Sequence, residues 1–284
     1  MPKGKTNLTS VFQALKGGRG SGNFGHSGIP GKHGGSAPKG GLSETVVGNI
    51  RIKGGTPEQI EAVKDLINSL PAWHTSLVND RVVDDLLQQY RHLPNYERLA
   101  EEARKVLQTG NMVIEFQDVT EAKRNPLTGE EVESVGGHVP NYISLRSSLT
   151  GDELKGILAH EIGHQVSYLG AKLTTGRDLR FGRNYKPAGE NLEGAWKRDR
   201  SDHEHTLGIQ GSNSERYQRW QKGFQLANAT TSRSYSPATN MEERFGQAFR
   251  MVATGRGEEL TPSVRRYVQK FFNKKPPSGS VGVD

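Results

Sequence analysis

The pattern of hydrophobic and polar positions predicts regular structure from about residue 44 onward. Residues 50–53 alternate between apolar and polar side chains, as a short strand does. Thr56, Pro57 and Gln59 then have the spacing of a capping box with proline in the first turn of a helix. This helix is expected to bury a stripe of apolar residues at helical spacing, namely Ile60, Val63, Ile67 and Leu70.

The segment that follows this helix is predicted to form scaffold. The expected elements are helices over 80–91 and 95–108, a strand over 112–116 and a hairpin over 131–145. Pro140 cannot donate to a sheet ladder, so it is tolerated only at the edge of a sheet. The strand over 139–145 is therefore either an ordinary edge strand or one that offers its backbone to an extended peptide.

The amphipathic segment that ends at Gly170 predicts the helix around which the rest of the chain is organised. Thr150 and Glu153 have the spacing of a second capping box, and Gly170 suits the end of a helix. The apolar positions form one stripe, made of Leu154, Leu158, Ile162 and Leu169. Because His160 and His164 fall roughly opposite this stripe, we expect the helix to line the floor of a cleft.

His160, Glu161 and His164 make an HExxH motif in this helix. Two histidines four residues apart lie on one helical face, so both imidazoles can bind one metal ion. Glu161 then stands beside that ion, where it can act as a general base. The motif predicts zinc-assisted hydrolysis; the longer metzincin pattern is excluded because Ser167 and Gly170 occupy its last glycine and histidine positions.

A catalytic zinc usually has three protein ligands, so one more ligand is needed from elsewhere in the chain. Residues 171–211 are polar and rich in glycine, arginine and lysine, and they are expected to form a long insertion or a lid beside the cleft. His203 and His205 lie in that stretch. Each is either a third metal ligand or a solvated loop residue.

The segment from 239 to 254 offers a stronger third ligand. Thr239 and Glu242 have the spacing of a capping box at its start. Its core stripe is formed by Met241, Phe245, Ala248, Phe249 and Val252. Glu242 is assigned to the helix start, whereas Glu243 lies on the opposite face with Gln247 and Arg250. We therefore select Glu243 as the ligand; the alternative is that both glutamates are solvated.

These two segments resemble the gluzincin peptidases, and in particular the catalytic domain of anthrax lethal factor. The resemblance rests on HEIGH at 160–164 and on the segment from 212 to 251. It implies that Glu243 binds zinc and that Tyr235 stabilises the oxyanion. The chain departs from the family pattern in the spacing of Tyr235, in Gly246, where alanine is usual, and in Gln247, which replaces a second glutamate.

Composition bounds the domain organisation. The chain has 284 residues, of which only 32% are hydrophobic and 35 are glycine, so one domain with unpacked ends is expected. We place a flexible, glycine-rich basic arm at 1–43, a zincin-like domain at 44–273 and a disordered tail at 274–284. The domain is expected to end with a helix capped by Thr261, with Pro262 in its first turn, that buries Val264, Val268 and Phe271.

The charge and the residue usage exclude several classes of function. Much of the net charge of +7 lies in the N-terminal arm, which favours solvated charge over nucleic-acid binding. The absence of cysteine excludes disulfides, thiolate ligands and cysteine nucleophiles. With no apolar run of about 20 residues and no signal-peptide core, we expect a soluble protein without a membrane partner.

The N-terminal arm contains a patterned segment, GSGNFGHSGIPGKHGGS, at 20–36. It resembles a GNFGH-x-G-x-PG-x-x-GGS segment of tailed-bacteriophage head-morphogenesis-type proteins. The resemblance implies a phage or prophage origin, with virion proteins as partners and a location in the virion or the host cytoplasm. His26 and His33 of this segment are read as solvated residues.

Together these features predict an α+β, zincin-like metallopeptidase that is mostly helical with a small sheet. One Zn²⁺ per chain is expected on His160, His164 and Glu243, with Glu161 and Tyr235 as catalytic residues and a protein or peptide as substrate. Two alternatives stay open. One is a lethal-factor-like toxin protease that acts on a host protein. The other is a virion structural or interaction protein whose metal site is not catalytic.

Overall fold

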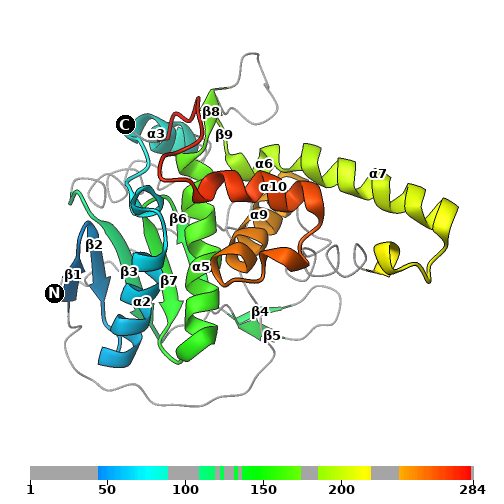
Figure 1. Cartoon of the computed structure of the whole chain (residues 1–284). Helices are drawn as coiled ribbons and strands as arrows, with labels where there is room; N and C mark the ends of the chain where they lie inside the picture. Colours follow the sequence, from blue (N-terminus) through cyan, green and yellow to red (C-terminus); the bar gives the residue numbers. More distant parts are fainter. Residues whose placement is uncertain are drawn as a thin grey trace.

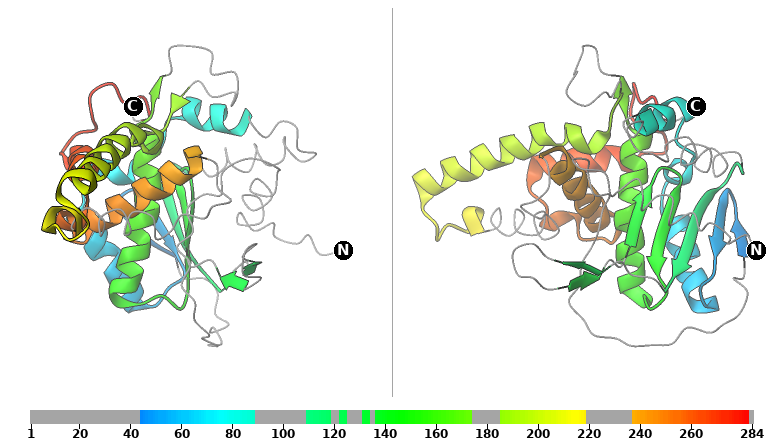
Figure 2. Two further views of the ribbon diagram at one scale, coloured as in Figure 1. Left: turned by 90° about the vertical axis from the view of Figure 1, so that its right-hand side faces the viewer. Right: turned by 180° about the vertical axis from the view of Figure 1, so that it is seen from behind.

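The computed structural model describes residues 44–88, 109–118, 122–124, 131–133, 136–173, 185–218 and 237–282 of the chain. In this part of the protein, helices predominate and lie mainly to one side of a five-stranded sheet, which two short strand pairs accompany (Figures 1 and 2). The expected combination of many helices with a small sheet is therefore confirmed. The N-terminal arm at 1–43, the helix expected over 95–108 and Tyr235 lie outside the described residues.

The main sheet has five strands in the order β1-β2-β3-β7-β6. Their bounds are Glu44–Val47 for β1, Ile50–Lys53 for β2, Met112–Gln117 for β3, Gly136–Val139 for β6 and Tyr142–Arg146 for β7. The inner pairs β2/β3 and β3/β7 are parallel, and the outer pairs β1/β2 and β6/β7 are antiparallel. Ile52, Ile114 and Ile143 stand opposite one another across the three central strands and are fully buried.

The expected hairpin over 131–145 is shorter in the structure. Only β6 and β7 form it, and the turn between them contains Pro140 and Asn141. The strand β5 (Glu131–Glu133) instead pairs with β4 (Ala122–Arg124) in a separate two-stranded sheet. The expectation of an edge strand over 139–145 is also corrected, because β7 pairs on both sides and β6 is the edge strand on this side of the described sheet.

Helix α2 (Pro57–Ser69) packs beside the central helix on one face of the sheet (Figures 1 and 2). The predicted capping box is present: the Thr56 hydroxyl accepts from the Gln59 amide at 3.3 Å, and the Gln59 side chain accepts from the Thr56 amide at 2.8 Å. The buried face is centred on Val63 and Leu66, while Ile60 and Ile67 are only partly buried. The 3-10 turn η1 (Ala72–Thr75) and helix α3 (Asp80–Gln88) follow.

The central helix, α5, spans Gly151–Leu169, with Thr150 and Gly170 at its two ends. The predicted capping box at its start is wrong, since the Thr150 side chain makes no cap hydrogen bond and only its carbonyl accepts, from the amide of Leu154 at 3.1 Å. Gly170 is required by close approach, because a Cβ there would lie 2.7 Å from the ring of Phe271.

The one-sided stripe expected for this helix is also corrected. From Gly156 onward every residue of α5 is buried, so the helix passes through the interior of the domain instead of lining an open floor. The sheet and α2 cover one side, and α9 (Pro237–Ala253) lies on the side of α5 away from α2 (Figure 1). Both faces are therefore covered by packed elements, which a single apolar stripe does not predict.

The stretch 171–211, expected as an insertion or lid, is largely helical. A short pair of strands, β8 (Lys172–Leu173) and β9 (Tyr185–Lys186), leads to α6 (Ala188–Asn191) and then to α7 (Glu193–Gln210). Four residues at the start of this helical region are buried in the core: Ala188, Leu192, Ala195 and Trp196. The rest of α7 extends away from the body of the domain (Figures 1 and 2). Its first turns are thus part of the fold.

Helix α9 begins earlier than expected, at Pro237, so Thr239 lies inside its first turn and does not cap it with Glu242. The predicted core stripe of α9 is confirmed, because Phe245, Ala248 and Phe249 are fully buried. Glu242 accepts a hydrogen bond at 2.9 Å from the backbone amide of Glu190, in the first turn of α6. The prediction that Glu242 serves the start of its own helix is therefore wrong, because its carboxylate accepts at the start of a neighbouring helix.

The chain ends with η2 (Gly257–Glu259), α10 (Pro262–Gln269) and η3 (Lys270–Phe272). Thr261 occupies the N-cap of α10 without a side-chain bond. Instead, the buried carboxylate of Asp199 on α7 accepts from the amides of Ser263 and Val264 at 2.9–3.0 Å. An acceptor with full negative charge at a helix N-terminus is favoured by the helix dipole.

The tail expected to be disordered from 274 onward is fastened to the domain at 281–282. The amide of Val281 donates to the carbonyl of Ala171, and the carbonyl of Gly282 accepts from the amide of Asn79, each at 2.8 Å. These bonds fasten the C-terminal residues to the end of α5 and the start of α3. Among the helices that the structure describes, none is long and apolar enough to cross a membrane.

Candidate metal centre

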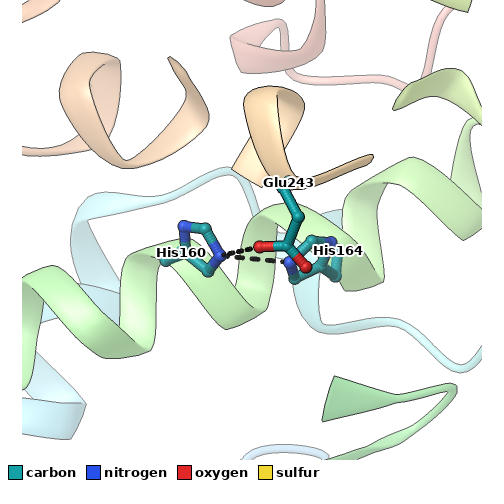
Figure 3. Close-up of side chains that lie close together, drawn as sticks. All are labelled: His160, His164 and Glu243. Carbon is teal, nitrogen blue, oxygen red and sulfur yellow. Dashed lines mark hydrogen bonds and ion pairs between the residues drawn. The ribbon is translucent and has the colours of Figure 1, made fainter. Parts of the chain in front are cut away.

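Three side chains predicted as metal ligands meet in the interior of the domain. His160 and His164 project from successive turns of α5, and Glu243 reaches them from α9 (Figure 3). The Nε2 atoms of the two histidines are 3.1 Å apart, and the Nε2 of His160 lies 3.5 Å from the carboxylate of Glu243. Within the described ranges this is the one group of its kind, and its candidate ligand atoms all lie within 4.8 Å of one another.

Two of the three ligand separations are compatible with the binding of one zinc ion. Zinc bonds of about 2.0–2.2 Å to imidazole nitrogen and carboxylate oxygen place two ligand atoms of a tetrahedral site about 3.3 Å apart. The separations of 3.1 Å and 3.5 Å lie on either side of that value. Two imidazoles and one carboxylate are also the ligand types that zinc accepts in catalytic sites.

Burial sets the protonation state of the site. His160 and Glu243 are fully buried, and His164 is 3% exposed. Burial, together with the positive charge of Arg250, lowers the pKa of His160 to about 3, although the Gln247 side chain acts in the opposite direction. His160 is therefore neutral at physiological pH, which is the form that binds a metal ion.

Two glycines allow α5 and α9 to approach closely enough to build the site. A Cβ on Gly163 would lie 3.0 Å from the Cα of Gly246, and a Cβ on Gly246 would lie 3.1 Å from Nε2 of both His160 and His164. A methyl group at Gly246 would thus enter the space between the ligand nitrogens. Glycine at position 246, where the sequence pattern led us to expect alanine, therefore lies at a close crossing of the two helices.

Glu161 lies on the neighbouring face of α5 and is fully buried. It is directed toward the edge strand β6, because a Cβ built on Gly136 would lie 2.9 Å from a carboxylate oxygen of Glu161. The absence of a side chain at Gly136 therefore lets the backbone of β6 pass directly beside this carboxylate. The structure therefore places the Glu161 carboxylate beside the sheet edge, on the face of α5 next to the one that carries the ligands.

The remaining candidates are not part of this group. His203 lies on α7, where its ring stacks on Tyr217 with ring centres 4.3 Å apart, and His205 is exposed on the same helix. Neither belongs to the described metal-ligating group. Tyr235 lies outside the described residues, as do His26 and His33.

The sequence analysis missed one residue next to the site. His138 on β6 is buried, and its ring stacks on His164 with ring centres 6.0 Å apart. It lies within the predicted hairpin, so its strand was anticipated. No spacing rule connects a strand residue to a helix residue 26 positions away, because their contact is set by how β6 packs on α5.

Comparison with known proteins adds no relative. The chain matches no protein-family model, no curated protein and no solved structure at a significant level.

Proposed function

We propose that this protein is a zinc-dependent endopeptidase that hydrolyses a peptide bond in a protein substrate. The observation that supports this function best is the meeting of His160, His164 and Glu243 within 4.8 Å, from two helices far apart in the sequence. Glu161 stands next to them on α5, where a general base is needed. A gluzincin-like arrangement needs this combination of two histidines, a glutamate ligand and a neighbouring glutamate base.

Each residue has a distinct role in the proposed reaction. His160, His164 and Glu243 hold the metal. Zinc, when bound, supplies a Lewis acid that acidifies water and polarises a carbonyl group. Glu161 takes the proton of the attacking water and returns it to the leaving amine. We assign stabilisation of the oxyanion to Tyr235, on the strength of the family resemblance alone.

A second function is favoured by the burial of the site. His160, Glu161 and Glu243 are each 0% exposed, so a substrate reaches them only after some part of the protein has moved. A metal held without access to substrate would serve the fold. In that case the protein is a structural or interaction protein with a non-catalytic metal site, and removing the metal lowers its stability without ending any reaction.

The biological setting is proposed from the N-terminal segment. Its resemblance to head-morphogenesis-type proteins supports a phage or prophage origin, with either a virion protein or a host protein as substrate. A lethal-factor-like toxin would cleave the host protein. Mass spectrometry of new protein N-termini, after expression of the active chain and of Glu161→Gln in host cells and in assembling virions, separates the two.

The experiment that tests the peptidase itself uses a mixture of peptides of diverse sequence incubated with zinc-loaded protein. The wild type is expected to cleave a subset, and Glu161→Gln is expected to keep the zinc while its turnover falls by about two to four orders of magnitude. Glu153→Gln, an exposed substitution on the same helix, is the matched control and should behave as wild type. Comparable cleavage by Glu161→Gln would refute the mechanism; zinc binding without any cleavage would favour the structural function.

A further inference from the structure

A buried polar network connects the end of the sheet to the metal-binding helix. Its centre is Gln165, the residue that follows His164 on α5. The Gln165 side-chain amide donates to the carbonyl of Ser76 at 2.9 Å and to the side chain of Asn141 at 3.0 Å. Its Oε1 accepts from the backbone amide of Asn141 at 2.9 Å and lies 2.8 Å from Nε2 of His138.

The backbone partners fix the orientation of every group in this network. A backbone carbonyl can only accept and a backbone amide can only donate, so Ser76 and Asn141 determine which end of the Gln165 amide is oxygen. Because that oxygen faces His138, the Nε2 of His138 must carry the proton and donate it. Asn141 is held in turn, since its side chain accepts from the amide of Val78 at 2.6 Å.

The conformation of Asn141 shows how firmly the turn is held. Its φ is 69°, in the left-handed region that residues other than glycine seldom occupy. Asn141 is fully buried, and its backbone and side chain are both bonded within the network. The position of β6 at this turn, and with it that of His138, is therefore determined by several hydrogen bonds at once.

The ring of His138 lies against two residues one turn apart on α5. Its centre is 6.0 Å from that of His164, with 25° between the ring planes, and 5.7 Å from that of Tyr168, with 21° between the planes. His164 is the second proposed metal ligand, and His138 contacts its ring from the direction of the sheet. His138 does not belong to the ligand group itself.

We propose that His138 is a positioning residue for the metal centre. The hydrogen bond to Gln165 fixes the imidazole of His138 in place. The ring of His164 packs against this imidazole and is thereby held in the orientation that directs its Nε2 toward His160 and Glu243. This inference rests on one part of the proposed function, the binding of zinc, and not on the hydrolysis of peptides. Outer residues that orient a ligand typically change metal affinity by about 10- to 100-fold when they are replaced.

The test compares two substitutions that both remove the hydrogen bond of His138. His138→Leu fills the space but has no ring, whereas His138→Phe keeps a flat ring that can stack on His164. His74→Leu is the matched control, because His74 is also a fully buried histidine that bonds a single acceptor, the carbonyl of Phe271 at 2.6 Å, and packs among aromatic rings. Zinc affinity is measured by competition with a chromogenic chelator, at a temperature where circular dichroism shows each variant folded.

The expected result is a rise in the zinc dissociation constant of about 10- to 100-fold for His138→Leu, and of less than about threefold for His138→Phe and His74→Leu. The absorption bands of the cobalt-loaded protein should shift in His138→Leu and stay unchanged in His74→Leu. Equal losses in the two leucine variants would show general loosening and overturn the proposal, as would a wild-type affinity in His138→Leu.

Two further outcomes are also decisive. Should His138→Leu fail to fold, His138→Phe decides alone, because a loss of about tenfold or more despite the retained ring would contradict the stacking role. A wild-type chain that binds no zinc would overturn both this inference and the proposed function. Zinc binding without peptide cleavage would remove only the peptidase and leave the role of His138 standing.

Discussion

Replacement of Gly246 by alanine tests whether the crossing of α5 and α9 shapes the metal centre. The new Cβ would lie 3.0 Å from Cε1 of His160 and 3.1 Å from Nε2 of both histidines, whereas ordinary contact begins at 3.4 Å. The histidines must therefore retreat by 3.4 − 3.0 = 0.4 Å or 3.4 − 3.1 = 0.3 Å, or the helices must separate by a similar amount. Metal sites tolerate changes in ligand distance of only about 0.2 Å.

The magnitudes separate an effect on the metal from an effect on the fold. Alanine in a helix interior gains about 0.5–1 kcal/mol over glycine, while overpacking costs about 1–3 kcal/mol, so the apo protein should lose at most about 2.5 kcal/mol. Zinc affinity should fall by about 10- to 100-fold, measured by chelator competition. Gly194→Ala on α7, where the nearest contact is an ordinary 3.7 Å, is the control and should leave zinc affinity unchanged. Wild-type affinity in Gly246→Ala would refute the reasoning, since it would mean that the helices separate at little cost.

Three more predictions concern the scaffold and the proposed oxyanion donor. Burial lowers the pKa of His74 from 6.5 to about 4, so its contribution to stability is complete above the unfolded pKa and is lost as the pH falls toward the folded pKa. Between about pH 7 and about pH 5 the contribution of His74 amounts to about 2 kcal/mol, measured in urea unfolding with chelator present as the difference between the pH-dependent losses of the wild type and of His74→Leu. Asp199→Ala removes the acceptor at the start of α10 and should lower the free energy of unfolding by about 1–3 kcal/mol, with zinc affinity unchanged; a loss of zinc would show that α10 supports the site directly. Tyr235→Phe should lower turnover with zinc retained, and an unchanged rate would assign the oxyanion to another donor.

The sequence predicted local structure well wherever neighbouring residues determine it. The capping box at Thr56, the strand at 112–116 and the core stripe of α9 depend on spacing within one element, and the structure shows them. The same is true of His160 and His164, which a single helix brings together. Glu243 could be chosen from its helix face, and the structure places it at the histidines.

The failures share a physical cause, which is packing between segments distant in the sequence. Thr261 leaves its helix start to Asp199, a residue from α7. The polar composition of 171–211 concealed a helix whose first turns are buried in the core. Gly246 and His138 gain their importance only when α9 and β6 pack on α5, and no local pattern reports such contacts.

The most direct test of the central claim is the metal content of the purified chain after identical dialysis of the wild type, Glu243→Ala and Glu242→Ala. The two glutamates are adjacent on α9, but Glu243 faces the histidines and Glu242 bonds the start of α6. The account predicts about one zinc per wild-type chain, lost in Glu243→Ala and retained in Glu242→Ala. No zinc in the folded wild type, or equal retention in both variants, would contradict it.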